Sequence, residues 1–328
     1  MRELRWYMHK LGMMFGAAPR KAGPDEETEA ARELKRFKKT PEQSKLRREL
    51  IQDEHDNPVI SNKWRYRRWA SIIIINALFI ISFTWDVQLV EGSMSASRFL
   101  GFHMADPNAA IQVMLAFKEV MLNLVIGTVT VVLLWWIFGG RAFCSWACPY
   151  HLLSEWAEFL HLWLHKKGWV KDHPFHRGLR VVLWVIFMAL AYFTGYTVFE
   201  YINPVGIVSR ALIYGPTVAV MWVIFLLGIE VFFSRRAWCR YICPIGLTYG
   251  MTGAVAPVQI HYDLNKCLHE GECRAVCLVP HVLEITKMGY ASDTEEFIGP
   301  DCTRCGMCID ACPQSALSFK VRGFDKII

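Results

Sequence analysis

Residues 141–152 read RAFCSWACPYHL, and residues 236–247 read RAWCRYICPIGL. The two segments begin 95 positions apart and are identical at six of twelve positions, including both cysteines and the proline. Each copy follows a pair of long apolar blocks. The spacing therefore predicts two similar halves, each a helical hairpin that ends in a C-x3-C-P motif.

The apolar blocks are the second feature that decides the fold. Of the residues, 53% are hydrophobic, and the mean hydropathy is +0.23. A helix needs about 20 apolar residues to cross a bilayer, and helices of soluble proteins are amphipathic, whereas these blocks are apolar all round. We therefore expect four transmembrane helices, at 69–87, 120–138, 179–199 and 217–233.

Lysine and arginine gather on one side of these predicted spans. On the opposite side, Arg98 is the only lysine or arginine between Glu91 and Phe117, and Arg210 is the only one between Tyr201 and Gly215. The positive-inside rule then places both termini and all eleven cysteines in the cytoplasm, where thiols stay reduced and suit metal ligation better than disulfides. The same rule accounts for the net charge of +6, so we expect no nucleic-acid partner.

The C-terminal cysteines follow a ferredoxin spacing. From Cys302 the chain reads C-x2-C-x2-C-x3-C-P through Cys305, Cys308 and Cys312. This run is typical of bacterial ferredoxins, in which the fourth cysteine ligates the other of two clusters. Zinc is the alternative, because four thiolates also suit zinc, but zinc ribbons pair C-x2-C units across a longer gap.

An imperfect run precedes it. Cys267, Cys273 and Cys277 occupy the first, third and fourth positions, and Glu270 occupies the second. Crossed ligation predicts one [4Fe–4S] cluster on Cys277, Cys302, Cys305 and Cys308, and a second cluster on Cys267, Cys273 and Cys312 with Glu270 at the fourth corner. A carboxylate is a hard ligand for a soft site. Either Glu270, or its neighbour His269, completes a labile [4Fe–4S] cluster, or the cluster is [3Fe–4S]; a degenerate run without a cluster is the remaining alternative.

The cysteines of the twin motifs are a third candidate site. Cys144 and Cys148, like Cys239 and Cys243, are four residues apart and would share one helix face. Four thiols from two halves could hold a third [4Fe–4S] cluster; copper is the second interpretation and a redox-active dithiol the third. Glu230 lies near the end of the fourth span and is a candidate proton acceptor for quinol oxidation.

Together these features resemble the NapH/NosR/MauN-type family of membrane iron–sulfur (polyferredoxin) proteins, and within it most of all the NapH type. The resemblance rests on the motifs at 144–149 and 239–244 and on the runs at 267–277 and 302–313. It implies quinol oxidation, electron delivery to other redox subunits, and the bacterial inner membrane. The chain departs from the family at Glu270 and in a longer charged N-terminus, which suggests a docking partner.

We therefore predict a charged cytoplasmic extension (1–62), a four-span membrane domain (63–255) and a small α+β ferredoxin-like domain (256–328). Within the extension, 2–15 is expected to be an interfacial or docking helix, and 25–48 a helix pair interrupted at Thr40–Pro41. The predicted function is an electron-transfer subunit of a membrane quinol dehydrogenase rather than a stand-alone enzyme. The alternatives are a copper-reducing or metal-centre assembly factor of the CcoG type, and a structural anchor.

Overall fold

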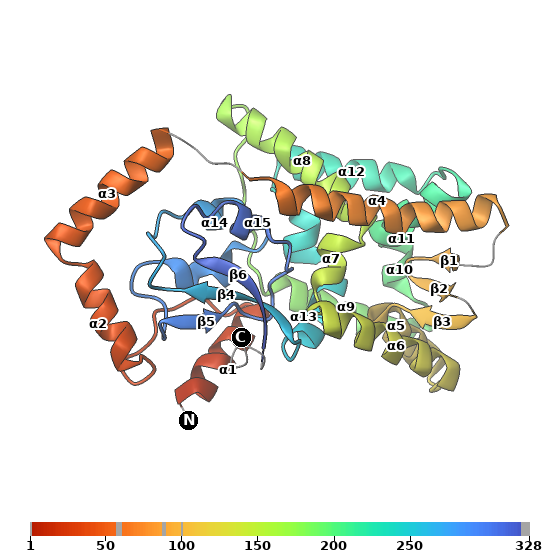
Figure 1. The fold of residues 1–328 in the computed structure, drawn as a ribbon. Helices are drawn as coiled ribbons and strands as arrows, with labels where there is room; N and C mark the ends of the chain where they lie inside the picture. Colours follow the sequence, from red (N-terminus) through yellow and green to blue (C-terminus); the bar gives the residue numbers. More distant parts are fainter. Residues whose placement is uncertain (1, 57–60, 87–89, 100, 323–328) are drawn as a thin grey trace.

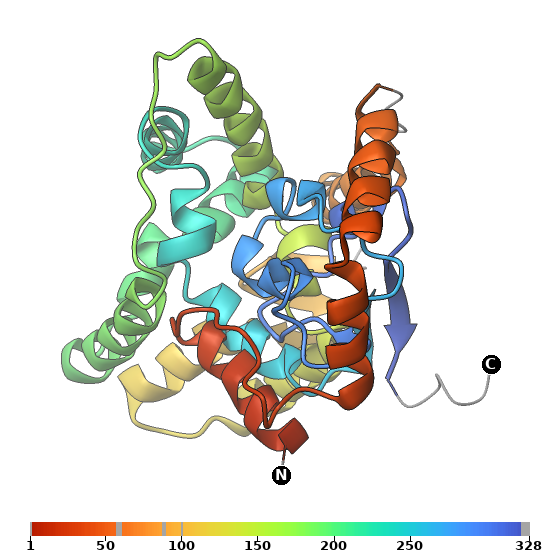
Figure 2. The same ribbon diagram turned by 90° about the vertical axis from the view of Figure 1, so that its left-hand side faces the viewer.

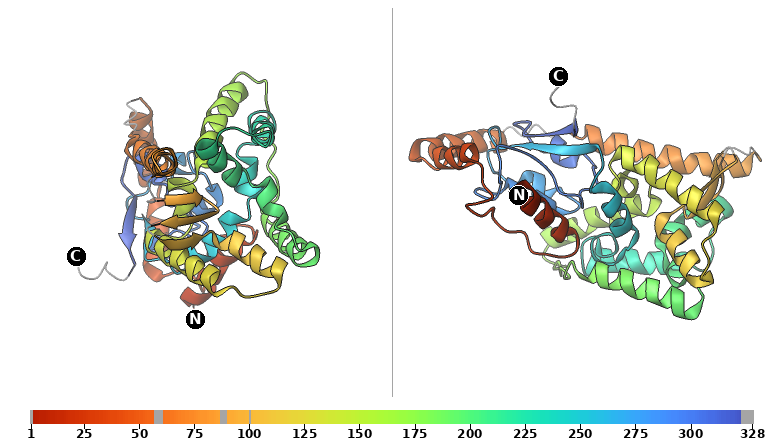
Figure 3. Two further views of the ribbon diagram at one scale, coloured as in Figure 1. Left: turned by 90° about the vertical axis from the view of Figure 1, so that its right-hand side faces the viewer. Right: turned by 90° about the horizontal axis from the view of Figure 1, so that it is seen from below.

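The computed structural model describes residues 2–56, 61–86, 90–99 and 101–322. A helical part follows residue 62, and a small αβ part with a three-stranded sheet completes the chain (Figure 1). Seen from below, the αβ part lies between the N-terminal helices and the helical part (Figure 3, right). The predicted α+β module next to a helical domain is thus present.

The helical part contains each of the four predicted apolar helices, together with shorter ones. Its elements are α4 (Lys63–Thr84), α5 (Pro107–Phe117), α6 (Leu122–Phe138), α7 (Ala142–Trp146), α8 (Pro149–Lys166), α9 (Leu179–Thr194), α10 (Val198–Ile202), α11 (Pro204–Tyr214), α12 (Val220–Phe232), η1 (a π-helical turn, Trp238–Ile242) and α13 (Ile245–Gly253).

The lengths of these helices differ from the prediction. Among the described residues, α4 with 22 residues is the one helix long and apolar enough to cross a membrane by itself. The helices α6, α9 and α12 are apolar but have 17, 16 and 13 residues. Four full-length spans are therefore not confirmed, and Val87, the predicted end of the first span, lies outside the described residues.

Two half-length helices, α5 and α11, were missed by the sequence analysis. Both begin at an Asx-Pro pair, Asp106-Pro107 and Asn203-Pro204. In each, the Asx side chain accepts hydrogen bonds from backbone N–H groups of the first turn, and proline at the first helical position loses no hydrogen bond. The internal repeat therefore extends well beyond the cysteine motifs.

The two halves are interleaved. Helix α5 of the first half packs against α9 and α13 of the second half, while α11 of the second half packs against α4 and α8 of the first. This exchange brings the two cysteine motifs together at the centre of the molecule. The helical part consequently forms one body rather than two separate hairpins, as the end-on view also shows (Figure 3, left).

A small antiparallel sheet that the sequence did not predict precedes α5. It consists of β1 (Val90–Ser93), β2 (Ala96–Phe99) and β3 (Phe102–Ala105), in that order. The last strand runs along α6, so closely that a Cβ atom on Gly127 would lie 2.6 Å from the carbonyl oxygen of His103. Only glycine permits this close approach. The strand β3 therefore lies directly against α6, and the chain continues from it into α5.

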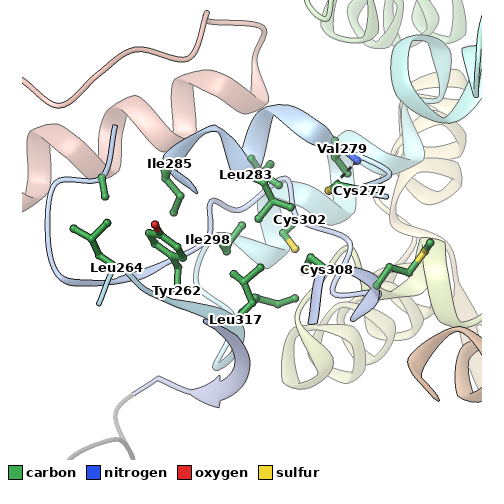
Figure 4. Packing of buried hydrophobic residues seen from close by; sticks show 14 of the residues in the cluster. Tyr262, Leu264, Cys277, Val279, Leu283, Ile285, Ile298, Cys302, Cys308 and Leu317 are labelled. Atoms are coloured by element: carbon green, nitrogen blue, oxygen red, sulfur yellow. Dashed lines mark hydrogen bonds between the residues drawn. The ribbon is translucent and has the colours of Figure 1, made fainter. Parts of the chain in front are cut away.

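The αβ part is built on β4 (Val258–Asp263), which pairs antiparallel with β5 (Glu295–Phe297) on one side and β6 (Leu317–Val321) on the other. The short helices α14 (Glu272–Ala275), η2 (Pro280–Thr286) and α15 (Met307–Asp310) complete it. Buried apolar side chains, among them Tyr262, Leu283 and Ile298, form its core, and Cys277, Cys302 and Cys308 lie in the same cluster (Figure 4).

The N-terminal segment forms α1 (Arg2–Met14), α2 (Glu29–Lys38) and α3 (Pro41–Asp56), so the predicted helix pair and its break at Thr40–Pro41 are present. Helices α1 and α2 lie beside the αβ part (Figure 2). Trp6 is buried in the core of the αβ part, and its indole N–H donates to the carboxylate of Glu296 at 2.9 Å. The first helix is therefore docked within its own chain.

Candidate metal centres

The two C-x3-C-P motifs adopt the same local structure. Cys144 and Cys239 lie in the short helices α7 and η1, whereas Cys148 and Cys243 follow in extended backbone, with φ, ψ of −66°, 118° and −63°, 112°. The residue before a proline is driven out of the helical region, which explains the extension. The second cysteine of each pair thus lies outside the helix that contains the first, so the two do not share one helix face as expected.

The structure nevertheless brings all four of these cysteines together. They line one cavity of about 530 Å³, counting space that opens to solvent. Basic side chains line the same cavity: Arg141, Arg236 and His151. The two arginines are buried. Val205, at the start of α11, also lines the cavity, so the positive end of that helix faces it.

This environment fits an anionic metal group. A cubane cluster held by four thiolates carries net negative charge, and buried arginines and a helix N-terminus stabilise negative charge. Arg236 is held by an ion pair with Glu158, and Arg141 by one with Asp301, so both arginines are fixed in place. The donor set of the cavity therefore suits an iron–sulfur cluster.

The first ferredoxin site collects the predicted cysteines from both runs. Cys277, Cys302, Cys305 and Cys308 are buried in one cluster. Backbone N–H groups donate to two of the sulfurs, from Arg304 to Cys302 at 3.4 Å and from Val279 to Cys277 at 3.4 Å. Burial, together with the charges of the neighbouring sulfurs, raises the pKa of Cys277 and Cys308, as expected for thiols placed around a common centre.

Residues from both runs also lie together at the second candidate ferredoxin site. Cys267 and Cys273 line a pocket together with Cys312 from the second run. Glu270 and His269 line the same pocket. Backbone N–H groups donate to its sulfurs as well, from His269 to Cys267 and from Ala316 to Cys312, both at 3.3 Å.

Glu270 takes the place in its loop that Cys305 takes in the other. Each residue lies between two positions with left-handed backbone: His269 and Gly271 have φ of 63° and 104°, and Arg304 and Gly306 have φ of 51° and 75°. The two loops thus follow the same path around their sites. Glu270 therefore lies at the same point of its loop as Cys305 does in the other, and it lines the pocket of the second site.

His269 is fixed beside this corner. Its Nδ1 donates to the carbonyl oxygen of Thr286 at 2.7 Å. Burial lowers the pKa of His269 to about 4, so the ring is neutral at physiological pH. Its Nε2 is buried and has no hydrogen-bond partner among the described residues.

The four-cysteine cavity adjoins the first ferredoxin site directly. Leu278, Val279 and Thr303, the neighbours of Cys277 and Cys302, line it. Both motifs bind these loops: Ser145 donates to the carbonyl of Thr303 at 2.6 Å, and Arg240 donates to that of Leu278 at 2.9 Å. One layer of residues therefore separates the two sites.

Glu230 is buried in α12, beside the second motif. Its Oε1 accepts a hydrogen bond from the backbone N–H of Trp238 at 3.1 Å, one residue before Cys239. The other carboxylate oxygen has no hydrogen-bond partner in the part of the chain that the structure describes. The side chain thus caps η1, and one oxygen remains for a further contact.

Within the described ranges, no three Cys, His, Asp or Glu side chains converge closely enough to hold a single metal ion. A cubane attaches each thiolate to a different iron, so its sulfurs stand further apart than the ligands of one ion.

Sequence reasoning missed the residues that connect the sites. Arg141 and Arg180 were taken only as markers of the cytoplasmic side, but both are buried and bind the carboxylate of Asp301 at 2.5 and 2.8 Å. Asp301 directly precedes Cys302. The arginine that begins each repeat is evident in the sequence, but no neighbouring residue indicates its partner.

Comparison with known proteins bears on these sites. A family model described as "4Fe-4S binding domain" matches residues 120–167 and 214–256, which include both C-x3-C-P motifs. A second model with the same description matches residues 300–318. The chain therefore contains iron–sulfur-binding domains in both of its parts.

Several curated proteins are similar over most of the chain. The methylamine utilization ferredoxin-type protein MauN of Methylorubrum extorquens is 33% identical over 267 residues, covering 79% of this chain and 89% of MauN. The ferredoxin-type protein NapH is 29% identical in Haemophilus influenzae and 27% in Escherichia coli; these matches cover 80% and 79% of this chain and 91% of each relative. No solved structure matches the chain.

Proposed function

The chain belongs to the family of ferredoxin-type proteins that includes MauN and NapH, and on this premise we propose that it is an electron-transfer subunit of a membrane-bound quinol dehydrogenase complex. In this role it passes electrons between the quinone pool and a partner redox protein. The iron–sulfur clusters, when bound, would supply the one-electron redox chemistry, and the protein would hold, space and shield them.

The observation that carries this proposal is the succession of three cysteine sites. The four-cysteine cavity is lined by the neighbours of Cys277 and Cys302, and the charge of Cys273 at the second ferredoxin site acts on Cys308 at the first. Redox centres that are separated by single layers of residues can exchange electrons. A continuous route thus leads from the helical part to the outer edge of the αβ part.

For the ligands we propose the crossed assignment. Cys277, Cys302, Cys305 and Cys308 hold one [4Fe–4S] cluster, and Cys144, Cys148, Cys239 and Cys243 hold another. Cys267, Cys273 and Cys312 hold a third, with Glu270 on its fourth iron. The matching backbone of Glu270 and Cys305 supports the last assignment, and the hardness of a carboxylate makes that iron labile.

We also propose that the helical part lies in the bacterial inner membrane as four spans with both termini in the cytoplasm. Large apolar side chains point outward from each of the four helices. Examples are Ile73 and Ile74 on α4, Leu133 on α6, Phe193 on α9 and Phe225 on α12. Soluble proteins rarely expose so continuous an apolar surface, whereas lipid would cover it.

The test is anaerobic purification followed by counts of iron and sulfide and by spectroscopy during addition of a quinol. Three clusters that bleach on addition of menadiol are expected. A protein with a full iron content that dithionite reduces, but no quinol does, would reject the quinol-linked role. Bound copper at the four-cysteine cavity, together with a full set of ferredoxin clusters, would instead favour an assembly factor.

A further inference from the structure

The first turns of α5 contain a group of buried polar atoms that the fold leaves without partners. Asp106, Asn108 and Gln112 are at least 95% buried. One carboxylate oxygen of Asp106, and both the oxygen and the nitrogen of each amide, have no hydrogen-bond partner among the described residues. Buried polar groups are almost always paired, so this concentration calls for a ligand.

The other half of the protein shows that the fold does not require these groups. Helix α11 corresponds to α5, and its equivalent residues are Asn203, Val205 and Ser209. There the side-chain oxygen of Asn203 accepts from the backbone N–H of Val205, and that of Ser209 from Met94 at 3.2 Å. The second copy is thus apolar or satisfied where the first copy presents two amides.

The position of the group connects it to the electron route. The phenol of Tyr249 in α13 lies beside the carboxylate of Asp106. The Tyr249 ring stacks on Phe143 with ring centres 4.7 Å apart, and Phe143 directly precedes Cys144. Both rings belong to the cluster that packs around the four cysteines. A ligand at the start of α5 would therefore lie about one side-chain layer from the candidate cluster.

The chemistry of the group limits the ligand. Amide nitrogens donate and amide oxygens accept, and the carboxyl group of Asp106 offers an acceptor oxygen in either protonation state. Carbonyl oxygens of a quinone match the donors, and hydroxyl groups of a quinol match the acceptors. The rest of α5 is apolar, with Ile111, Val113 and Met114 half-buried, as the ring and chain of a quinone require.

We propose that Asp106, Asn108 and Gln112 form a binding site for the polar head of a quinol or quinone. The inference rests on the proposed function and locates its substrate beside α5, where the unpaired atoms of two amides lie with one oxygen of Asp106, rather than beside Glu230. Ordered water offers the same hydrogen-bond chemistry, so the experiment has to separate the two occupants.

The internal repeat supplies the variants. Asn108→Val and Gln112→Ser introduce the residues that α11 has at the same positions, so each replacement fits a helix of this fold. Asn123→Val makes the same chemical change at an exposed position at the start of α6 and is the control. All three are purified with their clusters and mixed rapidly with menadiol, or with dithionite, and cluster bleaching is followed.

We expect Asn108→Val and Gln112→Ser each to raise the menadiol concentration for half-maximal rate at least tenfold. Dithionite reduction, iron content and the behaviour of Asn123→Val should match the wild type. If menadiol bleaches the wild type and both variants need the same menadiol concentration for half-maximal rate, the three polar residues hold only water and the inference is overturned. If wild type itself ignores every quinol, the proposed function has failed instead.

Discussion

The guanidinium of Arg141 binds Asp301 twice, through Nη1 to the carboxylate at 2.5 Å and to the main-chain carbonyl at 2.7 Å. Arg141 opens the first C-x3-C-P repeat, and Asp301 directly precedes Cys302. The same carboxylate accepts from Arg180 at 2.8 Å and contacts His281 at 2.9 Å. One buried carboxylate thus joins the helical part to the first ferredoxin site.

Asp301→Asn should weaken this junction. Burial alone would raise the pKa of Asp301, but the charges of Arg141 and Arg180 hold it well below its ordinary value, so the residue is charged in the folded protein. Its replacement leaves two buried arginines uncompensated, at a cost of about 3–5 kcal/mol. We expect a lower unfolding temperature and slower transfer between clusters, measured by thermal melting and rapid-mixing spectroscopy.

Asp25→Asn is the matched control, because Asp25 is exposed and its replacement should leave both measurements unchanged. Equal stability of the Asp301→Asn and Asp25→Asn proteins would show that the buried arginines do not need this carboxylate.

Changes at Glu270 should alter the iron content of the second ferredoxin site. Glu270→Cys supplies the soft ligand that Cys305 supplies in the other loop, and should give a stable [4Fe–4S] cluster. Glu270→Ala should yield a [3Fe–4S] cluster, one iron fewer per protein, which is paramagnetic when oxidised. Iron analysis and electron paramagnetic resonance distinguish the products. If the wild type, Glu270→Cys and Glu270→Ala all had the same iron content, Glu270 would not be a ligand at the fourth corner.

The cysteine sites could be predicted because their ligands follow local spacings. C-x2-C-x2-C-x3-C-P and the duplicated C-x3-C-P are short patterns, and the structure brings together the cysteines that they group. The crossed pairing of Cys312 with Cys267 was also accessible, because it follows from the ferredoxin pattern and needs no knowledge of packing.

The remaining features depend on contacts between distant parts of the chain. Arg141 and Asp301 are 160 residues apart, and a buried arginine beside an apolar block looks the same in sequence as one that marks the cytoplasmic side. Helices α5 and α11 are too short to cross a membrane, and the segments that contain them were assigned to loops because they lie between the predicted spans. Their Asx-Pro pairs were therefore not recognised as helix starts. The docking of α1 depends on Glu296, at the other end of the chain.

Gly140→Ala should disrupt the contact between the end of α6 and α13. Gly140 has φ of 68°, and an added Cβ would lie 2.2 Å from the backbone nitrogen of Gly253. Neither the backbone conformation nor the contact tolerates a side chain, so we expect a loss of several kcal/mol and poor cluster retention. Thermal melting in detergent and the iron content per protein measure both effects.

Gly228→Ala is the counterpart of this substitution. Gly228 lies inside α12, and nothing approaches within 4 Å of the position of its Cβ. Alanine there should stabilise the helix by about 0.5–1 kcal/mol. If Gly140→Ala melted at the same temperature as Gly228→Ala, the close approach of α6 and α13 would not exist in the protein.

Lys10→Met should release α1 from the αβ part without unfolding the rest. Lys10 and Glu296 form an ion pair at 2.7 Å with both side chains buried, and Trp6 donates to the same carboxylate. Removing the lysine leaves a buried charge, at a cost of about 3–5 kcal/mol, which detachment of a single helix relieves. Limited proteolysis between residues 15 and 22 should therefore become rapid, while the clusters keep their spectra.

The double variant Lys10→Met with Glu296→Gln tests whether the buried charge is the cause. With the carboxylate neutralised, α1 should dock again and protection should return in large part. Burial opposes ionisation of Glu296, but Lys10 and Trp6 lower its pKa overall. The ion pair therefore stabilises the docked α1 fully at any pH above the ordinary carboxyl range, and this stabilisation is lost only as the pH falls through the lowered pKa. Proteolytic protection of the wild type should consequently be the same from about pH 8 to pH 5. A protein whose α1 is released at pH 6, or a double variant as exposed as the single one, would contradict the assignment of this ion pair as the anchor of the N-terminus.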